Sequence, residues 1–490
     1  MKITVSGLKV RVENTDSTKI THVNSDLPLK HEIEISNKNK ILEIKNPAEH
    51  ATEIYIGLST DEVKVSSGFL DVVAIPLKIS LDKVISFLSG NKSIGDSIWE
   101  GVYVLGPGLS ASIGGERNIS FKERPWTCRH EDPAELLIEL ISRKTKGKNI
   151  VVRFSGGLES TSILAACCEI SSPEEILAIT WKSKDDTASS DVEEATKIAN
   201  KLGVRHRVLS IDESRLFCPV RPWSLSAYPN TSLGFCNFLQ DIDTYASSKV
   251  DSNRDTITLD GHGGDHIFWE YVEPHMLREC LGKGFLKMAN NYCDLYAKNF
   301  FEILKGIIAG EISSQNKYLE RKYRRSPTIT KRLSSTKNFR RERIRILLDE
   351  IASPPPSKNL EVFYPFATPA MIECSLGFKV SELFDSQNSR LPLRKSAHIK
   401  FGKDLYTRVG KGVVTSAYQR ALGQQKERLI TLVRNGFCAS NNLIDIHEFE
   451  RSYQMSLMGL NGIDYELFKI IILELLITHT KDALAMRNKS

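Results

Sequence analysis

The chain has 490 residues, of which 41% are hydrophobic and 26% are charged, and its formal net charge is +6. This length suffices for two or three domains with buried cores, and the composition is that of an ordinary globular protein. The most apolar late stretch contains Lys469 and Glu474, so it is too short and too polar to span a bilayer and predicts a core helix. The first residues include no sustained apolar segment and no small-residue cleavage site, which predicts a cytoplasmic protein without a signal peptide.

Charged residues and cysteines bear on partners and compartment. Residues 317–345 contain 12 Lys or Arg and 2 Glu, a local charge of +10 that leaves −4 for the rest of the chain. This basic segment is either a solvated insertion or a surface that attracts an acidic peptide, a partner protein or nucleic acid. The nine cysteines have no spacing typical of a zinc or redox motif, which favours reduced, mostly buried thiols.

Residues 1–127 predict a β-rich N-terminal domain. Short runs that alternate apolar and polar residues, such as KITVSGLKV, HEIEIS and TEIYIGLS, are separated by Asn, Asp, Ser and Gly, a pattern typical of antiparallel strands. The stretch ERPWTCRHEDP then predicts a linker. Asp132 and Pro133 form a helix start signal, and residues 132–143 place apolar side chains at helical spacing. We therefore expect a second domain over residues 132–480.

Beyond the linker, apolar strands alternate with amphipathic helices. The predicted strands are NIVVRF, ILAITWKS, RHRVLSI and TITLD, and the helices between the first three are ESTSILAACCEI and DVEEATKIANKLGV. This alternation is typical of an α/β fold whose parallel sheet is covered by helices on both faces. The rest of the chain is predicted to be chiefly helical, with an interruption at the SPPPS stretch of residues 353–357.

A glycine turn, RFSGGLESTS, follows the first of these strands. In a parallel sheet, ligands lie beyond the carboxyl ends of the strands, where helix N-termini present free amides. Ser155, Gly156, Gly157 and Ser160 lie at that point, and glycines and hydroxyls in such a turn favour phosphate binding. The alternative is a turn with a purely structural role, because a tight packing turn between a strand and a helix would contain the same residues. The Lys-Ser/Thr ending of the Walker loop is missing, which disfavours that ATPase class.

A second glycine turn, LDGHGGDHIF, follows the strand TITLD. It contains Asp260, His262, Asp265 and His266. Two acidic glycine turns at successive strand ends suit a magnesium–triphosphate site, because Mg²⁺ prefers a few carboxylates together with phosphate oxygens and water. The two turns therefore predict a triphosphate and Mg²⁺ as ligands.

Several motifs together resemble the asparagine synthetase family. SGGLES and the later GHGGDHIF are similar to the family's SGG-x-D-S and G-x-G-x-D-E motifs. DVEEATKIANKLGVRHRVL, VFYPFATPAMIECSLGF and RLPLRKSAHIKFGKDL resemble its adenine-side helix, its proline-phenylalanine segment and its late basic motif. The resemblance covers roughly residues 132–477. It implies an α/β ATP-pyrophosphatase domain after a β-rich domain that resembles a glutamine amidotransferase.

One branch of that family is more similar than the others. A glutamine-hydrolysing domain needs a cysteine directly after the initiator methionine, whereas this chain begins Met1-Lys2-Ile3 and has its first cysteine at Cys128. We therefore expect an amine source other than glutamine. GHGGDHIF and FLSGNKSIGDSIWEGVYVLGPG resemble the microcin-type lasso peptide cyclases, which join a peptide's N-terminal amine to an Asp or Glu side chain. β-Lactam synthetases, which also lack this cysteine, are the alternative.

The resemblance implies a bacterial, cytoplasmic, AMP-forming ligase that uses ATP and Mg²⁺. Its substrate would be a ribosomally made precursor peptide, whose carboxylate is adenylated and then closed into a macrolactam with release of AMP and pyrophosphate. A leader peptidase and a leader-binding element are the implied partners, and neither a membrane nor nucleic acid is expected. The rival outside enzymes is a binding protein with weakened catalysis, because Glu159 and His266 stand where the family has Asp and Glu.

The resemblance also implies a role for individual residues. The residues implied to bind ATP are Ser155, Gly156, Gly157, Ser160, Ile179, Thr180, Trp181, Gly263 and Gly264. Glu159 and Asp265 are implied to hold Mg²⁺. Lys411 and His266 are implied to act in catalysis.

Some of these roles have plainer alternatives. Glu159 could only complement the dipole of the following helix, Trp181 could be core packing, and His266 could be a hydrogen-bonded turn histidine. Lys395 and Lys403 compete with Lys411 for the catalytic role. Arg390 and Arg394 either shape the same pocket or are simple surface charges.

Overall fold

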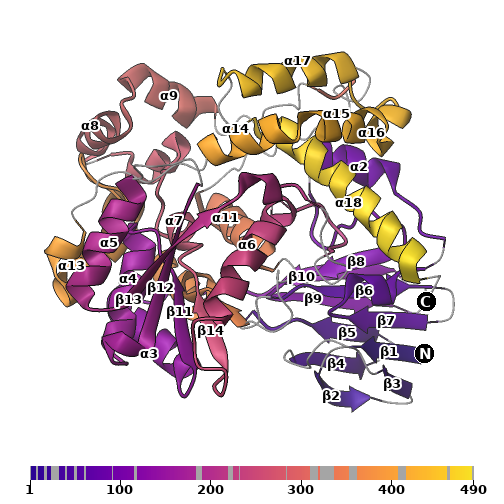
Figure 1. Cartoon of the computed structure of the whole chain (residues 1–490), viewed down its shortest axis with the longest axis horizontal. Coiled ribbons are helices and arrows are strands. Elements are labelled where there is room, and N and C mark those ends of the chain that lie inside the picture. The colour runs from indigo at the N-terminus through magenta and orange to yellow at the C-terminus, as the bar shows by residue number, and fades with distance from the viewer. Residues whose placement is uncertain are drawn as a thin grey trace.

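Figure 1 shows the computed structural model of the protein, in which a β-rich N-terminal region lies beside a larger α/β region. For residues 2–38 only the backbone is described. The residues that the structure describes are 2–6, 9–15, 19–23, 32–38, 41–48, 52–59, 62–74, 76–90, 92–114, 118–183, 190–218, 225–230, 232–282, 284–309, 318–320, 336–352, 361–406, 415–460 and 464–487.

The N-terminal region contains two five-stranded sheets, with the orders β3-β1-β7-β6-β8 and β10-β9-β5-β4-β2. The strands are β1 (Lys2–Ser6), β2 (Lys9–Thr15), β3 (Lys19–Val23), β4 (Glu32–Lys38), β5 (Ile41–Lys45), β6 (Ile54–Leu58), β7 (Glu62–Ser66), β8 (Val102–Leu105), β9 (Leu109–Ile113) and β10 (Ile119–Glu123). The predicted β-rich region is therefore confirmed. The expectation of antiparallel strands is wrong in part, because β1 pairs in parallel with β3 and β7, and β2 with β4. The first four strands alternate between the two sheets, so a strand can return to its sheet in the same direction.

The α/β region is built on a five-stranded sheet in which all neighbouring strands are parallel. Its order is β13-β12-β11-β14-β15, and the strands are β11 (Asn149–Arg153), β12 (Ile176–Ser183), β13 (Arg205–Ile211), β14 (Thr256–Leu259) and β15 (Glu361–Phe363). This confirms the predicted α/β class. From β11 the chain adds β12 and then β13 on one side of β11, and it later adds β14 and β15 on the other side. The order therefore reverses beside β11, which is where such sheets bind ligands.

Helices surround this sheet and extend over the N-terminal sheets (Figure 1). Those of the first half of the chain are α1 (Phe69–Val72), α2 (Leu81–Leu88), α3 (Pro133–Thr145), α4 (Leu158–Cys168), α5 (Ser190–Leu202) and α6 (Ser232–Ser247). Those of the second half are α7 (Gly264–Ile267), α8 (Phe285–Tyr296), α9 (Phe300–Ala309), α11 (Thr336–Ile351), α12 (Pro369–Leu376), α13 (Leu391–Phe401), α14 (Thr415–Gln424), α15 (Lys426–Arg434), α16 (Phe437–Ser440), α17 (Ile446–Leu457) and α18 (Tyr465–Arg487).

The two faces of the parallel sheet belong to two different hydrophobic cores. In β11, Val151 packs into one core, whereas Ile150 and Val152 pack into the other. Successive side chains of a strand point to opposite faces, so an all-apolar strand such as β11 requires cover on both. The predicted late core helix is α18, whose apolar residues are buried along most of its length. None of the helices in the described part of the chain combines the length and apolar character needed to cross a membrane.

The N-terminal sheets share a core with the α/β region. Tyr55, Phe69 and Trp99 belong to the same hydrophobic cluster as Val151 and the buried residues of α18. Burial of apolar surface is the main stabilising contribution to folding, so the two regions stabilise each other. The boundaries at residues 1–127 and 132–480 remain a prediction.

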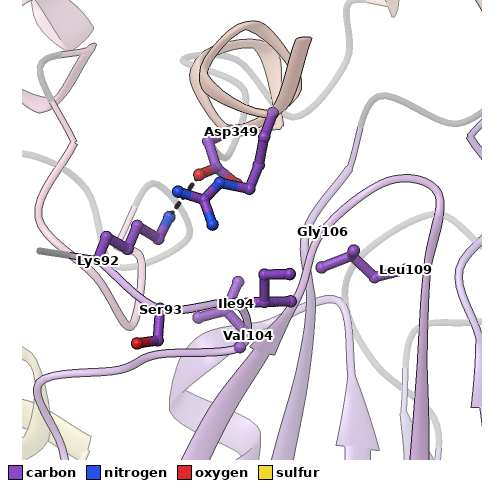
Figure 2. Close-up of a pocket in the computed structure, with 9 residues that line it drawn as sticks. Lys92, Ser93, Ile94, Val104, Gly106, Leu109 and Asp349 are labelled. Atoms are coloured by element: carbon purple, nitrogen blue, oxygen red, sulfur yellow. Dashed lines mark hydrogen bonds and ion pairs between the residues drawn. The ribbon is translucent and has the colours of Figure 1, made fainter. Parts of the chain in front are cut away.

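Polar contacts cross the same boundary, which we call the seam. Glu53 N donates to Ala352 O over 3.1 Å, and Lys92 Nζ lies 2.9 Å from Asp349 Oδ2. Figure 2 shows the second contact, where Lys92 and Asp349 meet above a hollow whose floor includes Val104. The hollow has a volume of about 10 Å³, the space of about one water molecule, so it is too small for a nucleotide or a peptide.

The basic segment lies partly within the described residues. Its C-terminal part belongs to α11, where Arg340 is buried and donates to Phe378 O over 2.8 Å. Arg345 forms an ion pair with Glu342 one turn away. These arginines are thus neither a solvated insertion nor an open basic surface. All nine cysteines are free, as expected, but only four of them are buried, four are partly buried and Cys128 is exposed.

Candidate active site

The first glycine turn joins β11 to α4 at the point where the strand order reverses. Phe154 N donates to Ile179 O over 2.8 Å, which continues the sheet one residue beyond β11. Gly156 then has a φ of +71°, in the left-handed region that favours glycine. A side chain there would place its Cβ 3.0 Å from the backbone nitrogen of Ala195 in α5. The tight turn and the closeness of α5 both require glycine at this position.

Two serine hydroxyls close this turn. Ser155 Oγ lies 3.1 Å from Ser160 Oγ and accepts from Gly157 N over 3.3 Å. Ser155 N donates to Ser160 Oγ over 3.3 Å. The structure thus brings together the residues predicted to bind phosphate, at the N-terminus of α4, where the helix dipole favours an anion. Their phosphate-binding role remains a prediction.

The second glycine turn packs directly on the first. A Cβ added to Gly261 would lie 3.1 Å from Ser160 N, and one added to Gly264 would overlap Cγ of Glu159. Gly263 has a φ of +105° and lies against Leu347 of α11. The second turn can approach the first this closely because it has no side chains at these positions. The two predicted metal-binding acids therefore come from turns that are in contact.

The predicted metal ligand Glu159 is buried and forms an ion pair with Arg390 at the start of α13. Arg390 has a φ of +56°, and its Nη2 lies 3.5 Å from Glu270 Oε1. Burial disfavours the charged guanidinium, but Glu159 and Glu270 outweigh it and raise the pKa of Arg390. Arg390 is therefore part of the site rather than a surface charge. Oε2 of Glu159 points toward Gly157, 3.9 Å from where a Cβ of that glycine would lie.

The other predicted metal ligand, Asp265, contacts an imidazole. His266 Nδ1 lies 3.0 Å from Asp265 Oδ1, and the two histidine rings of the turn are 5.2 Å apart. His262 Nε2 lies 2.9 Å from Glu350 Oε2 of α11. Burial favours a neutral imidazole, but the contact with Glu350 outweighs it and raises the pKa of His262. The same contact outweighs burial at Glu350 and lowers the pKa of that carboxyl group.

A buried arginine links the ends of the two central strands. Arg153, the last residue of β11, forms two hydrogen bonds with Asp243 of α6, of 2.8 and 3.0 Å. Its other terminal nitrogen lies 2.9 Å from Asp260 Oδ2, directly after β14. Burial opposes the charge of Arg153, but Asp243 and Asp260 together raise its pKa. Asp260 Oδ1 also accepts from His262 N over 2.9 Å, so this strand-end acid fixes the second turn.

The predicted adenine-binding residues lie on β12, beside the end of β11. Ile179 pairs with Arg153 across the sheet and is buried. Thr180 Oγ1 donates to Phe154 O over 2.7 Å and lies 2.8 Å from His206 Nε2. Trp181 packs its ring edge-on against Phe238, with centroids 4.9 Å apart. These contacts position the strand end, and the adenine-binding role remains a prediction.

The predicted catalytic Lys411 lies outside the described residues. Its competitors Lys395 and Lys403 are both exposed. Arg394 is buried one turn after Arg390. Burial, together with the positive charge of Arg390, lowers the pKa of Arg394. It therefore belongs to the interior beside the site.

Sequence reasoning missed several residues that complete the site. They are Arg153, Asp243, Glu270 and Glu350. Arg153 had a recognisable signal, because a charged residue ended an otherwise apolar strand just before the glycine turn. Glu270 follows the second glycine turn by a few residues, whereas Asp243 and Glu350 come from helices distant in the sequence, where no local pattern separates them from ordinary polar residues.

A parallel α/β sheet with two acidic glycine turns in contact at its switch point defines a nucleotide-binding type of protein. The sequence model described as asparagine synthase matches residues 134–475. The chain therefore belongs to the asparagine synthase family. Membership supports an ATP-dependent enzyme that forms amide bonds.

Individual proteins of known name are similar to parts of the chain. The microcin J25-processing protein McjC from Escherichia coli is 22% identical over 387 residues, which cover 78% of this chain and 68% of that protein. The NH₃-dependent NAD⁺ synthetase of Hyperthermus butylicus is 38% identical over 64 residues, which cover 13% of this chain and 23% of that protein. The similarity to the synthetase is thus restricted to a short segment.

Two solved structures are also similar to parts of the chain. The NH₃-dependent NAD synthetase from Campylobacter jejuni has a TM-score of 0.21 and 16% identity, covering 29% of this chain and 59% of that one. The U34-tRNA thiolase NcsA from Methanococcus maripaludis has a TM-score of 0.24 and 11% identity, covering 66% of this chain and 78% of that one.

Proposed function

We propose that this protein is a lasso peptide cyclase. In the proposed reaction, an Asp or Glu carboxylate of the peptide attacks the α-phosphorus of ATP, which forms an acyl-adenylate and releases pyrophosphate. The N-terminal amine of the peptide then attacks the acyl carbon, AMP leaves, and the amine loses one proton as the amide forms. The similarity to a microcin-processing protein over 78% of the chain supports a peptide substrate.

One observation carries the proposal: the second glycine turn packs on Glu159 of the first. ATP-dependent adenylation needs stabilisation of the negative charge around the α-phosphorus, and the carboxylates of two acidic turns in contact would hold the Mg²⁺ that supplies it. Glu159 and Asp265 have the carboxylate chemistry that Mg²⁺ prefers, and the ion would neutralise the phosphates. Glu159 directs its Oε2 toward Gly157, on the side where the hydroxyls of Ser155 and Ser160 lie.

The remaining residues position these groups. Arg153 holds Asp260, and with it the second turn, against the end of β11. Arg390 holds the side chain of Glu159 in the interior. Lys411, as the implied donor to the α-phosphate, and the glycines Gly263 and Gly264, as pyrophosphate contacts, complete the proposed site.

The N-terminal region is proposed to be a scaffold or a peptide-recognition surface that resembles a glutamine amidotransferase domain in shape. A leader peptidase and a leader-binding element are the proposed partners, since a cyclase of this kind acts on a freshly cut core peptide. A cytoplasmic location in a bacterium is part of the same proposal.

The test combines the purified protein, a candidate peptidase, MgATP and a precursor peptide, and records the peptide mass together with the nucleotide products. A cleaved core lighter by one water, with an equal amount of AMP, is expected. Glu159→Gln and Asp265→Asn should each lower the rate by at least about 100-fold, because each removes a carboxylate that would hold Mg²⁺ against the phosphates. Glu135→Gln is the matched control, because Glu135 is exposed on α3 and pairs with Lys400 at the surface.

Three outcomes would contradict the proposal. ADP in place of AMP would contradict adenylation. Pyrophosphate released with a free amino-acid derivative but never with a peptide would favour the β-lactam type of synthetase. ATP binding without pyrophosphate release from any substrate would favour a binding protein.

A further inference from the structure

We propose that His262, His266 and Glu350 form a binding site for a transition-metal ion of the zinc type, separate from the magnesium site. One ligand atom from each residue lies within 4.8 Å of the other two. Two imidazole nitrogens and one carboxylate oxygen are a ligand set typical of zinc sites that keep a fourth position open. The site uses none of the predicted ATP and magnesium ligands, and it shares only His266 with the residues predicted to act in catalysis.

The distances in this cluster, which we call the His-His-Glu cluster, agree with tetrahedral coordination. Glu350 Oε2 lies 2.9 Å from His262 Nε2 and 3.3 Å from His266 Nε2. Zinc bonds of about 2.0 to 2.2 Å at tetrahedral angles separate neighbouring ligand atoms by about 3.4 Å. The two separations that involve Glu350 Oε2 are thus within about 0.5 Å of this value, and the imidazole ligand atoms lie within 4.8 Å of each other.

The imidazole of His266 is already oriented by a second contact, and His262 is held through its backbone. His266 presents Nε2 to the cluster because its Nδ1 lies 3.0 Å from Asp265 Oδ1, the carboxylate–histidine arrangement that fixes the tautomer of metal-binding histidines. His262 is fixed through its backbone, since its N–H donates to Asp260 Oδ1 over 2.9 Å. Asp260 is in turn held by Arg153. The ligands are thus preorganised before any ion binds.

The third ligand is presented by packing of α11. Leu347 of α11 lies against Gly263, where an added Cβ would be 2.9 Å from Leu347 Cδ1. Glu350 is three residues later and therefore on the same face of the helix, which directs it at the second turn. The side chains of His262 and Glu350 are 39% and 33% exposed, so an ion can reach the cluster from solvent.

The chemistry of the donors separates this site from the magnesium site. Mg²⁺ prefers oxygen ligands and retains water, whereas imidazole suits zinc and its neighbours in the transition series. We expect an ion at this site to fasten α11 to the second glycine turn. Without an ion, the same three groups would share protons through hydrogen bonds to Glu350, and this is the alternative that the experiment must exclude.

The test uses the full chain after treatment with a chelator. Zn²⁺ is titrated in competition with a chromophoric chelator in the presence of excess Mg²⁺. One equivalent should bind with a Kd of about 1 μM or tighter. His262→Gln, His266→Gln and Glu350→Gln should each weaken binding by at least about 100-fold, and Asp265→Asn, which removes only the orienting contact, by about 10-fold.

Two controls keep the experiment decisive. His447→Gln changes an exposed histidine of α17, distant in sequence from the cluster, and should leave zinc binding unchanged. Co²⁺ should give the absorption of nitrogen and oxygen ligands without the charge-transfer bands of thiolates, which excludes binding by the nine free cysteines. Melting curves of the variants show whether they fold.

Equal zinc affinity in the three ligand variants and the parent, thiolate bands with Co²⁺, or displacement by Mg²⁺ would each overturn the metal site. None of these results depends on peptide cyclisation. Failure of the metal site is therefore distinguishable from failure of the proposed function.

Discussion

Two buried glutamates show how differently this protein treats the same side chain. Glu159 in the first glycine turn and Glu53 at the seam are 8% and 3% exposed. Glu159 is paired with the guanidinium of Arg390. Glu53 instead accepts from two hydroxyls, those of Tyr55 at 2.7 Å and Ser226 at 2.8 Å. One buried acid has a charged partner and the other has only neutral ones.

The different partners of Glu53 and Glu159 affect how readily each carboxylate is protonated. A buried carboxylate without a cation takes up a proton more readily, and burial raises the pKa of Glu53 from its ordinary value of 4.5 to about 7. Lys92 opposes this increase but is itself paired with Asp349. The seam therefore tolerates a neutral acid that joins two regions, whereas the acid of the first turn lies beside a cation, Arg390 at the start of α13. A buried acid with a charged partner at a strand end is the better indication of a functional site.

The largest expected effect comes from removing the cation of the first turn. Arg390→Met keeps the volume of the side chain and leaves Glu159 buried without a partner. Loss of one member of a buried pair costs about 3 to 5 kcal/mol of stability, and the rate of cyclisation should fall by at least about 100-fold. Urea unfolding and the rate of AMP release measure the two effects. If Arg390→Met unfolds at the same urea concentration as the parent, the pair contributes no stability and the contrast with Glu53 disappears.

The second prediction concerns the pH dependence that Glu53 gives to the seam. Below pH 4.5 the carboxyl group is protonated in the folded and unfolded chain alike, and between pH 4.5 and about 7 only the folded chain retains the proton. The free energy of unfolding should therefore fall as the pH rises through this window, by up to about 3 kcal/mol. Glu53→Gln removes this decrease.

The measurement compares urea unfolding of the parent and Glu53→Gln at about pH 5 and about pH 8. The variant should be the more stable protein at the higher pH and should differ little at the lower one. Its rate of AMP release should equal that of the parent, because Glu53 lies at the seam and not in the glycine turns. A constant difference between the two proteins at both pH values would mean that Glu53 titrates normally.

The same contrast separates what the sequence could predict of the fold from what it could not. The strands and helices of the α/β region followed from apolar runs and glycine turns, which are local patterns, and β11, β12, β13 and β14 are where they were expected. The parallel pairs among the first four strands were missed, because pairing direction depends on which sheet the chain enters next. Nothing in an alternating pattern encodes that choice.

The candidate site divides in the same way. Glu159 and Asp265 were recognisable because they stand next to glycines after apolar strands. Their surroundings were not: Glu350 is 88 residues from His262, and Asp243 is 90 residues from Arg153. These partners lie on helix faces whose own sequence resembles a solvated surface. Only the packing of α6 and α11 against the sheet brings them to the turns.

The smallest expected effect sharpens the comparison from the side of the seam. Ser226→Ala removes one of the two hydroxyl donors to Glu53, and the contact with Ser226 is one of those that lower the pKa of that group. A hydrogen bond to a charged group contributes about 1.5 to 3 kcal/mol, so the variant should lose about that much stability at high pH, where the carboxyl group is ionised. The loss should be smaller at low pH, where the protonated carboxyl group is a weaker acceptor. Unfolding of Ser226→Ala in the Glu53→Gln background is the control, and an equal loss at every pH in both backgrounds would show that the hydroxyl does not act on the carboxylate.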